Sequence, residues 1–254
     1  YEHTGVTLRS CSTTLDTDNA VYDGCLFSGG LLVTAANVTV KRSKIEGIVG
    51  ALNYGPYTNN LRGLTLTDVE IDGSAYNDPH GQAAIGLDNY TCIRCDVHHT
   101  GRGANFRNNV RIEDSYFHDF KYVSGAHQSG IGSNGGSGSR IIHNNIQCNG
   151  VGGSGCSGAL VMYGDFDPID DVLVERNLLN TDGSYCTYAG STGTASGKAY
   201  PHGTNVRYVD NRFGKKYYNT CGDNGPAAAW EYNSGNVWSG NTWLDGSGAI
   251  TPVL

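Results

Sequence analysis

Hydrophobic and polar residues alternate in short segments that recur along the whole chain and follow one template. Two apolar residues stand two positions apart, a small or amide residue follows three positions later, and a further apolar residue comes two positions after that. Clear copies are residues 37–45, 109–117, 171–179 and 205–213. The small or amide slot recurs at Cys25, Ser43, Val69, Cys95, Ser115, Asn144, Asn177, Asn211 and Asn241.

This template predicts a stack of β-coils. Alternation with a period of two indicates strands, and the Gly, Asn and Asp residues between copies indicate turns. Most copies are separated by about 20 to 34 residues, which is the repeat length of a solenoid. No long amphipathic helix is visible, so we expect parallel strands that stack about 4.8 Å apart, with equivalent slots forming internal ladders. At the turns, Asn can cap backbone groups and tolerates the left-handed conformation.

Composition agrees with a β-rich, folded chain. The 254 residues include 37 Gly, with 38% hydrophobic, 10% aromatic and 16% charged residues. Gly is costly inside helices, whereas the aromatic content supplies apolar surface to bury. We expect one domain over residues 1–254. No apolar run approaches the roughly 20 residues that span a bilayer, so no membrane partner is predicted.

The charge balance narrows the range of partners. The net charge is -7, from 17 Lys and Arg against 24 Asp and Glu, and the largest basic cluster is the pair Lys215 and Lys216. Nucleic acid is therefore excluded as a partner, because binding phosphates needs a basic patch. An acidic polysaccharide is only mildly disfavoured, because a groove can be locally cationic.

Eight cysteines indicate an oxidising compartment, and we interpret the chain, which starts at Tyr1, as a mature secreted protein. Sequential pairing predicts the disulfides Cys11–Cys25, Cys148–Cys156 and Cys186–Cys221. Cys92 and Cys95 would face opposite sides of a regular strand, which makes their pairing doubtful. They could form half of a zinc site, but no second CxxC or HxxxH follows at a useful distance.

The chain resembles single-stranded right-handed parallel β-helices of the pectate-lyase-like class, and especially secreted β-helix repeat proteins of actinobacteria and their phages. The matching stretches are residues 36–45, 126–131, 156–166 and 235–243. The resemblance covers nearly the whole chain and implies an all-β solenoid of about eight to nine coils. That class includes lyases, epimerases, hydrolases and adhesins, so it leaves the chemistry open.

A second series of short strands between the template copies predicts a binding face. If these strands stack in register, one outward column carries Phe106, Tyr188 and Trp230, and the next includes Asn134, Tyr163 and Tyr232. Aromatic rings stack on sugar faces and amides bind sugar hydroxyls, so this surface suits a polysaccharide. The predicted substrate-binding residues are Phe106, Asn134, Tyr188, Trp230, Glu231 and Tyr232. The alternative is that these aromatic side chains pack beneath loops.

Residues 163–168, Tyr-Gly-Asp-Phe-Asp-Pro, are similar to the Tyr-Gly-Phe-Asp-Pro-His signature of mannuronan C-5 epimerases, which share their fold with alginate lyases. One residue is inserted, and Ile169 stands where that family has its histidine. The similarity implies uronate chemistry. We expect His127 and Tyr163 to transfer protons and Arg107 or Lys198 to neutralise the sugar carboxylate. Asp165 would orient the site, with Lys198 on a loop that folds over it.

The predicted function is therefore a secreted polysaccharide lyase that acts as a monomer on a uronic-acid-containing glycan. No cofactor is required, although a calcium-dependent variant would use Asp165 and Asp167 as ligands. A glycoside hydrolase that uses Asp165, Asp167 and Glu231 is the main alternative. A non-catalytic glycan-binding adhesin is the third. His98 and His99 have no companion ligands nearby in the sequence.

Overall fold

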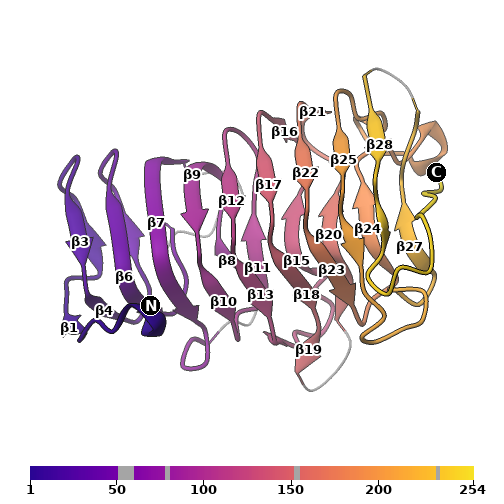
Figure 1. The fold of residues 1–254 in the computed structure, drawn as a ribbon. Helices are drawn as coiled ribbons and strands as arrows, with labels where there is room; N and C mark the ends of the chain where they lie inside the picture. The colour runs from indigo at the N-terminus through magenta and orange to yellow at the C-terminus, as the bar shows by residue number, and fades with distance from the viewer. Residues whose placement is uncertain (51–59, 78–80, 152–154, 233–234) are drawn as a thin grey trace.

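The computed structural model describes residues 1–50, 60–77, 81–151, 155–232 and 235–254. These residues form an all-β fold of parallel sheets, as predicted, and successive segments stack in chain order along one long axis (Figure 1). Helix is limited in the described residues to the 3-10 turns η1 (Glu2–Thr4) and η2 (Thr194–Ser196). No described helix has the length and hydropathy needed to cross a membrane.

The largest sheet has 17 strands and comprises two rows that meet at a corner. The first row contains β3 (Val21–Asp23), β6 (Thr39–Glu46), β7 (Asn60–Asp72), β9 (Asp88–Ile93), β12 (Arg111–Glu113), β17 (Arg140–Ile142), β22 (Leu173–Glu175), β25 (Arg207–Val209) and β28 (Val237–Ser239). The second row contains the C-terminal ends of β6 and β7 together with β1 (Arg9–Ser10), β4 (Cys25–Ser28), β10 (Asp96–His98), β13 (Tyr116–His118), β18 (Asn145–Cys148), β23 (Leu178–Thr181), β26 (Arg212–Phe213) and β29 (Thr242–Trp243). The second row has one additional strand, β1, which precedes the first copy of the sequence template and pairs with β4.

A six-stranded parallel sheet forms a further face of the stack. Its strands are β8 (Ala83–Ile85), β11 (Arg102–Asn105), β15 (Gln128–Ser133), β20 (Cys156–Met162), β24 (Tyr185–Ala189) and β27 (Gly225–Ala228). Three two-stranded sheets complete the coils: β2 (Thr14–Leu15) with β5 (Leu32–Val33), β14 (Phe120–Lys121) with β19 (Gly150–Val151), and β16 (Gly136–Ser137) with β21 (Ile169–Asp170).

A single residue with positive φ forms the corner between the two rows at each level. These corner residues are Gly24, Arg42, Asp68, Arg94, Asp114, His143, Arg176, Asp210 and Gly240. One left-handed residue reverses the side-chain alternation, so the next residue points inward again. The small or amide slot of the template is that next residue, and the left-handed position therefore precedes the slot rather than coinciding with it. Asn at the first template position does adopt positive φ, as at Asn37, Asn109 and Asn205.

Where the slot is Ser or Asn, its side chain connects neighbouring coils through the interior. Asn144 donates its backbone N–H to the Oδ1 of Asn177 at 2.9 Å, and Asn211 donates to Asn241 at 3.0 Å. Two residues after each slot except the last, an apolar side chain is fully buried, and these side chains form the predicted ladder of Phe27, Ile45, Ile71, Val97, Phe117, Ile146, Leu179 and Phe213. The corresponding residue after the last slot, Trp243, is partly buried. The core is thus a column of stacked equivalent positions.

The three predicted disulfides, Cys11–Cys25, Cys148–Cys156 and Cys186–Cys221, are present. The doubt about Cys92 and Cys95 was wrong, because these two residues also pair. Arg94 lies between them in the left-handed corner, with φ of 52°. The corner turns both sulfur atoms toward the core, where Cys92 and Cys95 are 0% and 2% exposed. Four disulfides are consistent with an extracellular protein.

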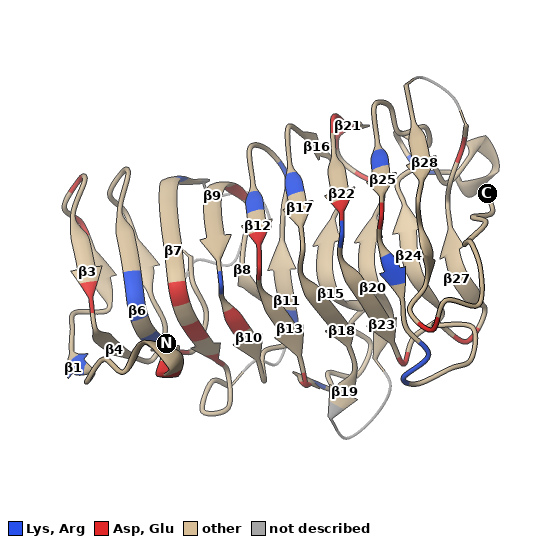
Figure 2. Cartoon of the chain, viewed as in Figure 1, with Lys and Arg blue, Asp and Glu red and all other residues tan. Residues whose placement is uncertain are grey.

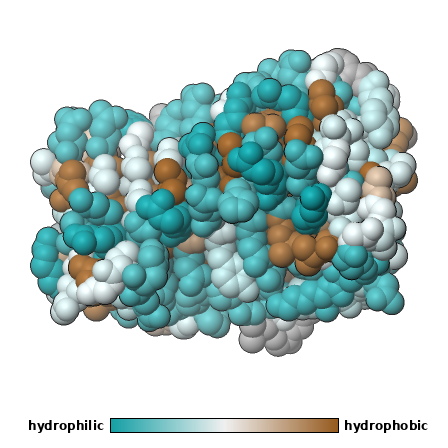
Figure 3. Space-filling model, in the orientation of Figure 1, coloured by the Kyte–Doolittle hydropathy of each residue, from teal (hydrophilic) through white to brown (hydrophobic). Residues whose placement is uncertain are grey.

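Charged residues on the strands are mostly exposed or half-buried. Acidic and basic bands lie beside one another on β6, β7 and β10 in Figure 2. The face shown in Figure 3 is mostly hydrophilic, with small separate hydrophobic areas. Recognition on this face would therefore depend mainly on polar groups.

Candidate functional site

The six-stranded sheet brings together part of the predicted binding face. Its register aligns Asn105, Gly132, Val161 and Tyr188 on consecutive strands. Phe106 is the residue after Asn105, so it lies outside this column, and its ring is buried at 1% exposure. The prediction that Phe106 lies on the outward face is therefore wrong, because the strand register differs by one residue from the expected one.

Trp230 is also part of the core rather than of a binding groove. Its ring is 3% exposed and packs edge-on against Tyr208 and Trp238, with centroid separations of 6.1 and 5.3 Å. Trp230 lies just beyond the end of β27, where the interior of the last coils is filled by large rings. The predicted exposure of Trp230 is wrong because this ring completes the packing at that end.

Other predicted contact residues lie where a ligand could reach them. Asn134 is exposed and Tyr232 is 70% exposed, whereas Tyr188 is half-buried. The Tyr188 ring lies 5.3 Å from that of Tyr163. The rings of Phe166 and Tyr200, which were not predicted as contact residues, are also exposed, at 52% and 41%. Exposed aromatic side chains of this kind can stack on sugar rings.

The predicted proton-transfer pair is not brought together. His127 directly precedes β15, whereas Tyr163 directly follows β20, and these two strands run parallel in the same sheet. The two residues thus lie at opposite ends of the strands, about 20 Å apart at roughly 3.3 Å per residue. The pairing of His127 with Tyr163 is wrong because the strand length separates them.

Arg107 has a structural partner of its own. Its guanidinium bonds the carboxylate of Asp88, with a 3.0 Å contact from Nε to Oδ1, and Asp88 is 4% exposed. Arg107 follows β11, and β15 separates that strand from β20. Of the two cations predicted to neutralise a substrate carboxylate, Lys198 is therefore the one beside Tyr163.

Lys198 folds over Tyr163 as predicted. Its Nζ lies 4.9 Å from the centre of the Tyr163 ring and 2.7 Å from Oδ1 of Asp165. The loop of residues 190–203 holds this arrangement, because the backbone N–H of Tyr200 donates to the carbonyl of Gly164 at 2.8 Å. We refer to this segment as the covering loop. Tyr163, Asp165 and Lys198 are thus a real cluster, on one edge of the six-stranded sheet.

The covering loop also carries a histidine that sequence analysis did not select. The Nδ1 of His202 lies 2.8 Å from Oε2 of Glu231, and its Nε2 lies 3.2 Å from the hydroxyl of Thr194. The His202 side chain is 46% exposed. A carboxylate that fixes one ring nitrogen leaves the other to exchange protons. The long insertion that contains His202 was the feature of the sequence that could have indicated it, but only Lys198 was predicted from that insertion.

Burial makes ionisation of the two tyrosines in this cluster less favourable. Burial of the ring raises the pKa of Tyr163, and the neighbouring Tyr188 and Asp165 raise it further. Burial likewise raises the pKa of Tyr188. A tyrosine hydroxyl is protonated at neutral pH even when it is exposed, and burial makes its ionisation still less favourable. Tyr163 is therefore present as the neutral phenol, which has a proton to donate.

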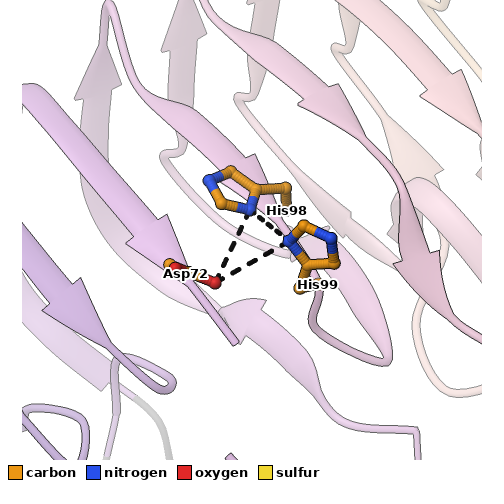
Figure 4. A group of neighbouring side chains, drawn as sticks. All are labelled: Asp72, His98 and His99. Carbon is orange, nitrogen blue, oxygen red and sulfur yellow. Dashed lines mark hydrogen bonds and ion pairs between the residues drawn. The ribbon is translucent and has the colours of Figure 1, made fainter. Parts of the chain in front are cut away.

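The predicted calcium ligands do not form the best metal-binding group among the described residues. Asp165 is compensated by the ammonium of Lys198, which calcium would have to displace. The described residues contain one group of three His, Cys or acidic side chains with ligand atoms close enough for a metal ion, and it comprises Asp72, His98 and His99 (Figure 4). His98 and His99 thus have a companion ligand after all, one coil earlier in the chain.

Comparison of the chain with protein-family models, curated proteins and solved structures finds no significant match.

Proposed function

We propose that this chain is a secreted, single-stranded right-handed parallel β-helix that cleaves a uronic-acid-containing polysaccharide by β-elimination. The observation that carries the proposal is the position of Lys198, whose ammonium lies over Tyr163 and beside Asp165. A half-buried ammonium next to a protonated phenol offers a sugar carboxylate one cationic partner and one proton donor. Exposed Phe166, Tyr200 and Tyr232 supply flanking rings for further sugar units.

In this reaction Lys198 would bind the carboxylate and make the adjacent C–H proton more acidic. His202, held by Glu231, would take that proton. The electron pair of the C–H bond would form the new double bond, and the glycosidic C–O bond on the neighbouring carbon would break. Tyr163 would protonate the departing oxygen, which balances the reaction. Lys198 and His202 are four residues apart in the covering loop, so their backbones are within about 14 Å of each other.

Glycoside hydrolysis is the second candidate, because Asp165 and Glu231 both face the covering loop. They follow β20 and β27, which are separated by β24, so their backbones are two strand spacings apart, about 9 to 10 Å. The two carboxyl groups of an inverting pair are about 6.5 to 9.5 Å apart, and backbones at this spacing allow that separation. However, a glycosidase acid needs apolar surroundings that keep it protonated, whereas each of these carboxylates contacts a basic side chain.

The test is to incubate the protein with a panel of polyuronates and measure the ultraviolet absorbance of an unsaturated uronate product. Absorbance that grows with time supports the lyase. New reducing ends without that absorbance would show a hydrolase instead, and saturable binding without cleavage would show an adhesin. No binding to any polyuronate or neutral polysaccharide would overturn the glycan proposal altogether.

A further inference from the structure

Three side chains of metal-ligand type meet on the outer face of the second row, away from the covering loop. Asp72 ends β7, His98 ends β10, and His99 is the next residue. The two Nδ1 atoms of His98 and His99 are 2.6 Å apart, and Oδ1 of Asp72 lies 3.6 and 3.7 Å from them (Figure 4). We refer to these three residues as the histidine cluster.

The strand register and one backbone kink produce this arrangement. Asp72 and His98 are direct partners in the parallel pairing of β7 with β10. Consecutive residues of a strand normally point to opposite faces, but His99 has φ of 54°, which turns its ring to the same side as that of His98. Gly73 permits the kink, because a Cβ there would lie 2.3 Å from the carbonyl oxygen of His99.

The spacing of the three atoms suits a single metal ion. Ligands on a tetrahedral zinc ion with bonds of about 2.0 to 2.1 Å are roughly 3.3 Å apart. The observed separations of 2.6, 3.6 and 3.7 Å lie on both sides of that value. A small rotation of the His99 ring, which is 39% exposed, would open the shortest separation.

Neighbouring side chains hold the ligands as outer-shell partners do in metal sites. Nε2 of His98 lies 3.4 Å from Oε1 of Glu70. A proton on Nε2 that faces this carboxylate leaves the lone pair on Nδ1, the atom that points into the cluster. Lys44 holds Oδ2 of Asp72 at 3.1 Å, and Ser74 donates its N–H to Oδ1 at 2.8 Å. The carboxylate is thereby kept in place and charged.

We propose that the histidine cluster binds a first-row divalent metal ion, with zinc as the ion that best fits two imidazoles and one carboxylate. Water would complete the coordination on the exposed side of His99. Calcium and magnesium prefer oxygen ligands and would bind weakly or not at all. This site does not depend on the proposed function, because it lies on the 17-stranded sheet, whereas Tyr163 follows a strand of the six-stranded sheet and Lys198 lies in the covering loop.

The experiment titrates Zn²⁺ into the chelator-treated full chain, without a histidine tag, by calorimetry. We expect one Zn²⁺ per chain, no comparable heat from Ca²⁺, and a higher unfolding temperature with Zn²⁺ than without it. His99→Ala is the main variant because its exposed ring contributes little to packing, and it should weaken binding by about 10-fold or more. Asp72→Asn should do the same.

His143→Ala is the matched control. His143 is also an exposed histidine in the left-handed conformation, and it contacts a single carboxylate, Asp114, at 2.6 Å. This variant should bind Zn²⁺ like the unmodified chain. The proposal is overturned if no saturable Zn²⁺ binding occurs, or if His99→Ala, shown to be folded by its circular dichroism, binds Zn²⁺ as tightly as His143→Ala.

Discussion

Asn177 donates both its backbone N–H and its side-chain amide to Oδ1 of Asn211, at 2.9 and 3.0 Å. The same side-chain amide also donates to the carbonyl of Ile141 at 2.8 Å, and the side chain of Asn177 is fully buried. One amide therefore links three consecutive coils inside the core. Buried groups satisfied in this way are costly to leave without partners.

Asn177→Ala should accordingly be among the most destabilising single substitutions in the chain. It removes the acceptor of the Asn144 backbone N–H and leaves the Ile141 carbonyl without this donor. We expect a loss of about 2 to 4 kcal/mol in the free energy of unfolding. Thermal unfolding measures the effect, with the exposed Asn219→Ala as control. Equal unfolding temperatures for the two variants would contradict the role of the ladder.

The two disulfides with the shortest and longest loops should differ in their contribution to stability. Cys92 and Cys95 are 3 residues apart, and Cys186 and Cys221 are 35 apart. Loop-closure entropy predicts about 2 kcal/mol for the first and about 4 kcal/mol for the second. The double variants Cys92→Ala/Cys95→Ala and Cys186→Ala/Cys221→Ala test this by denaturant unfolding. A larger loss from the first pair would exclude the entropic explanation.

Lys198→Met should abolish most of the proposed lyase activity. Removing a group that stabilises developing charge lowers turnover by about 100-fold or more. Lys215→Met is a closely matched control, because the Nζ of Lys215 also lies over an aromatic ring, Trp243 at 4.8 Å, and beside a carboxylate, Asp245 at 2.8 Å. Initial rates on the polyuronate that is cleaved provide the measurement. If both variants keep full turnover, Lys198 has no part in the chemistry.

Tyr163→Phe and His127→Ala should have opposite outcomes. The first removes the proposed proton donor and should reduce turnover by about 100-fold. The second changes an exposed side chain at the far end of the sheet, and the rate should stay near that of the unmodified chain. Steady-state kinetics on the same substrate distinguishes the two. A severe loss in His127→Ala alone would show that His127 and not Tyr163 takes part in the chemistry, and would place the site at the start of β15.

Ionisation of Asp68 should make the free energy of unfolding depend on pH in the acidic range. The hydrogen bond from Arg94 is the largest influence that lowers the pKa of this carboxyl, and His3 adds to it, while partial burial opposes them. Because the folded-state pKa lies below the unfolded value, the contribution is present above about pH 4 and is lost as pH falls through the folded-state pKa. Asp68→Asn, which also tolerates positive φ, should therefore lose less stability on acidification than the unmodified chain.

Unfolding midpoints at neutral pH and near pH 3 measure this difference. Asp223→Asn, at an exposed position, serves as the control and should follow the unmodified chain. An unchanged pH dependence in Asp68→Asn would show that the ion pair with Arg94 contributes nothing.

The features that could be predicted from the sequence are those that repeat. The inward small or amide slot and the apolar slot recur from coil to coil, so their stacking follows from the pattern alone. The register of the six-stranded sheet was missed because its strands, such as residues 128–133, contain small residues that give weak alternation. Phe106 was assigned to the wrong face for this reason.

The site residues depended on geometry that no local pattern contains. Asp72 meets His98 only through pairing across a coil, and His99 joins them only because of its left-handed backbone. Lys198 could be predicted, because a long insertion beside the strand end has to lie over it. The role of Glu231 as the partner of His202 depended on how that insertion folds back.

The corner hydrogen bond between coils is the same whatever number of residues separates its partners. It joins residues 18 apart at Cys25 and Ser43, 29 apart at Ser115 and Asn144, and 34 apart at Asn177 and Asn211. Loop length has thus varied along this chain without altering the contact that sets the stacking. The covering loop could be lengthened, shortened or exchanged while the core keeps its pairing, which makes ligand selectivity separable from folding. Such a scaffold suits diversification and loop grafting, with the changes confined to one edge of the stack.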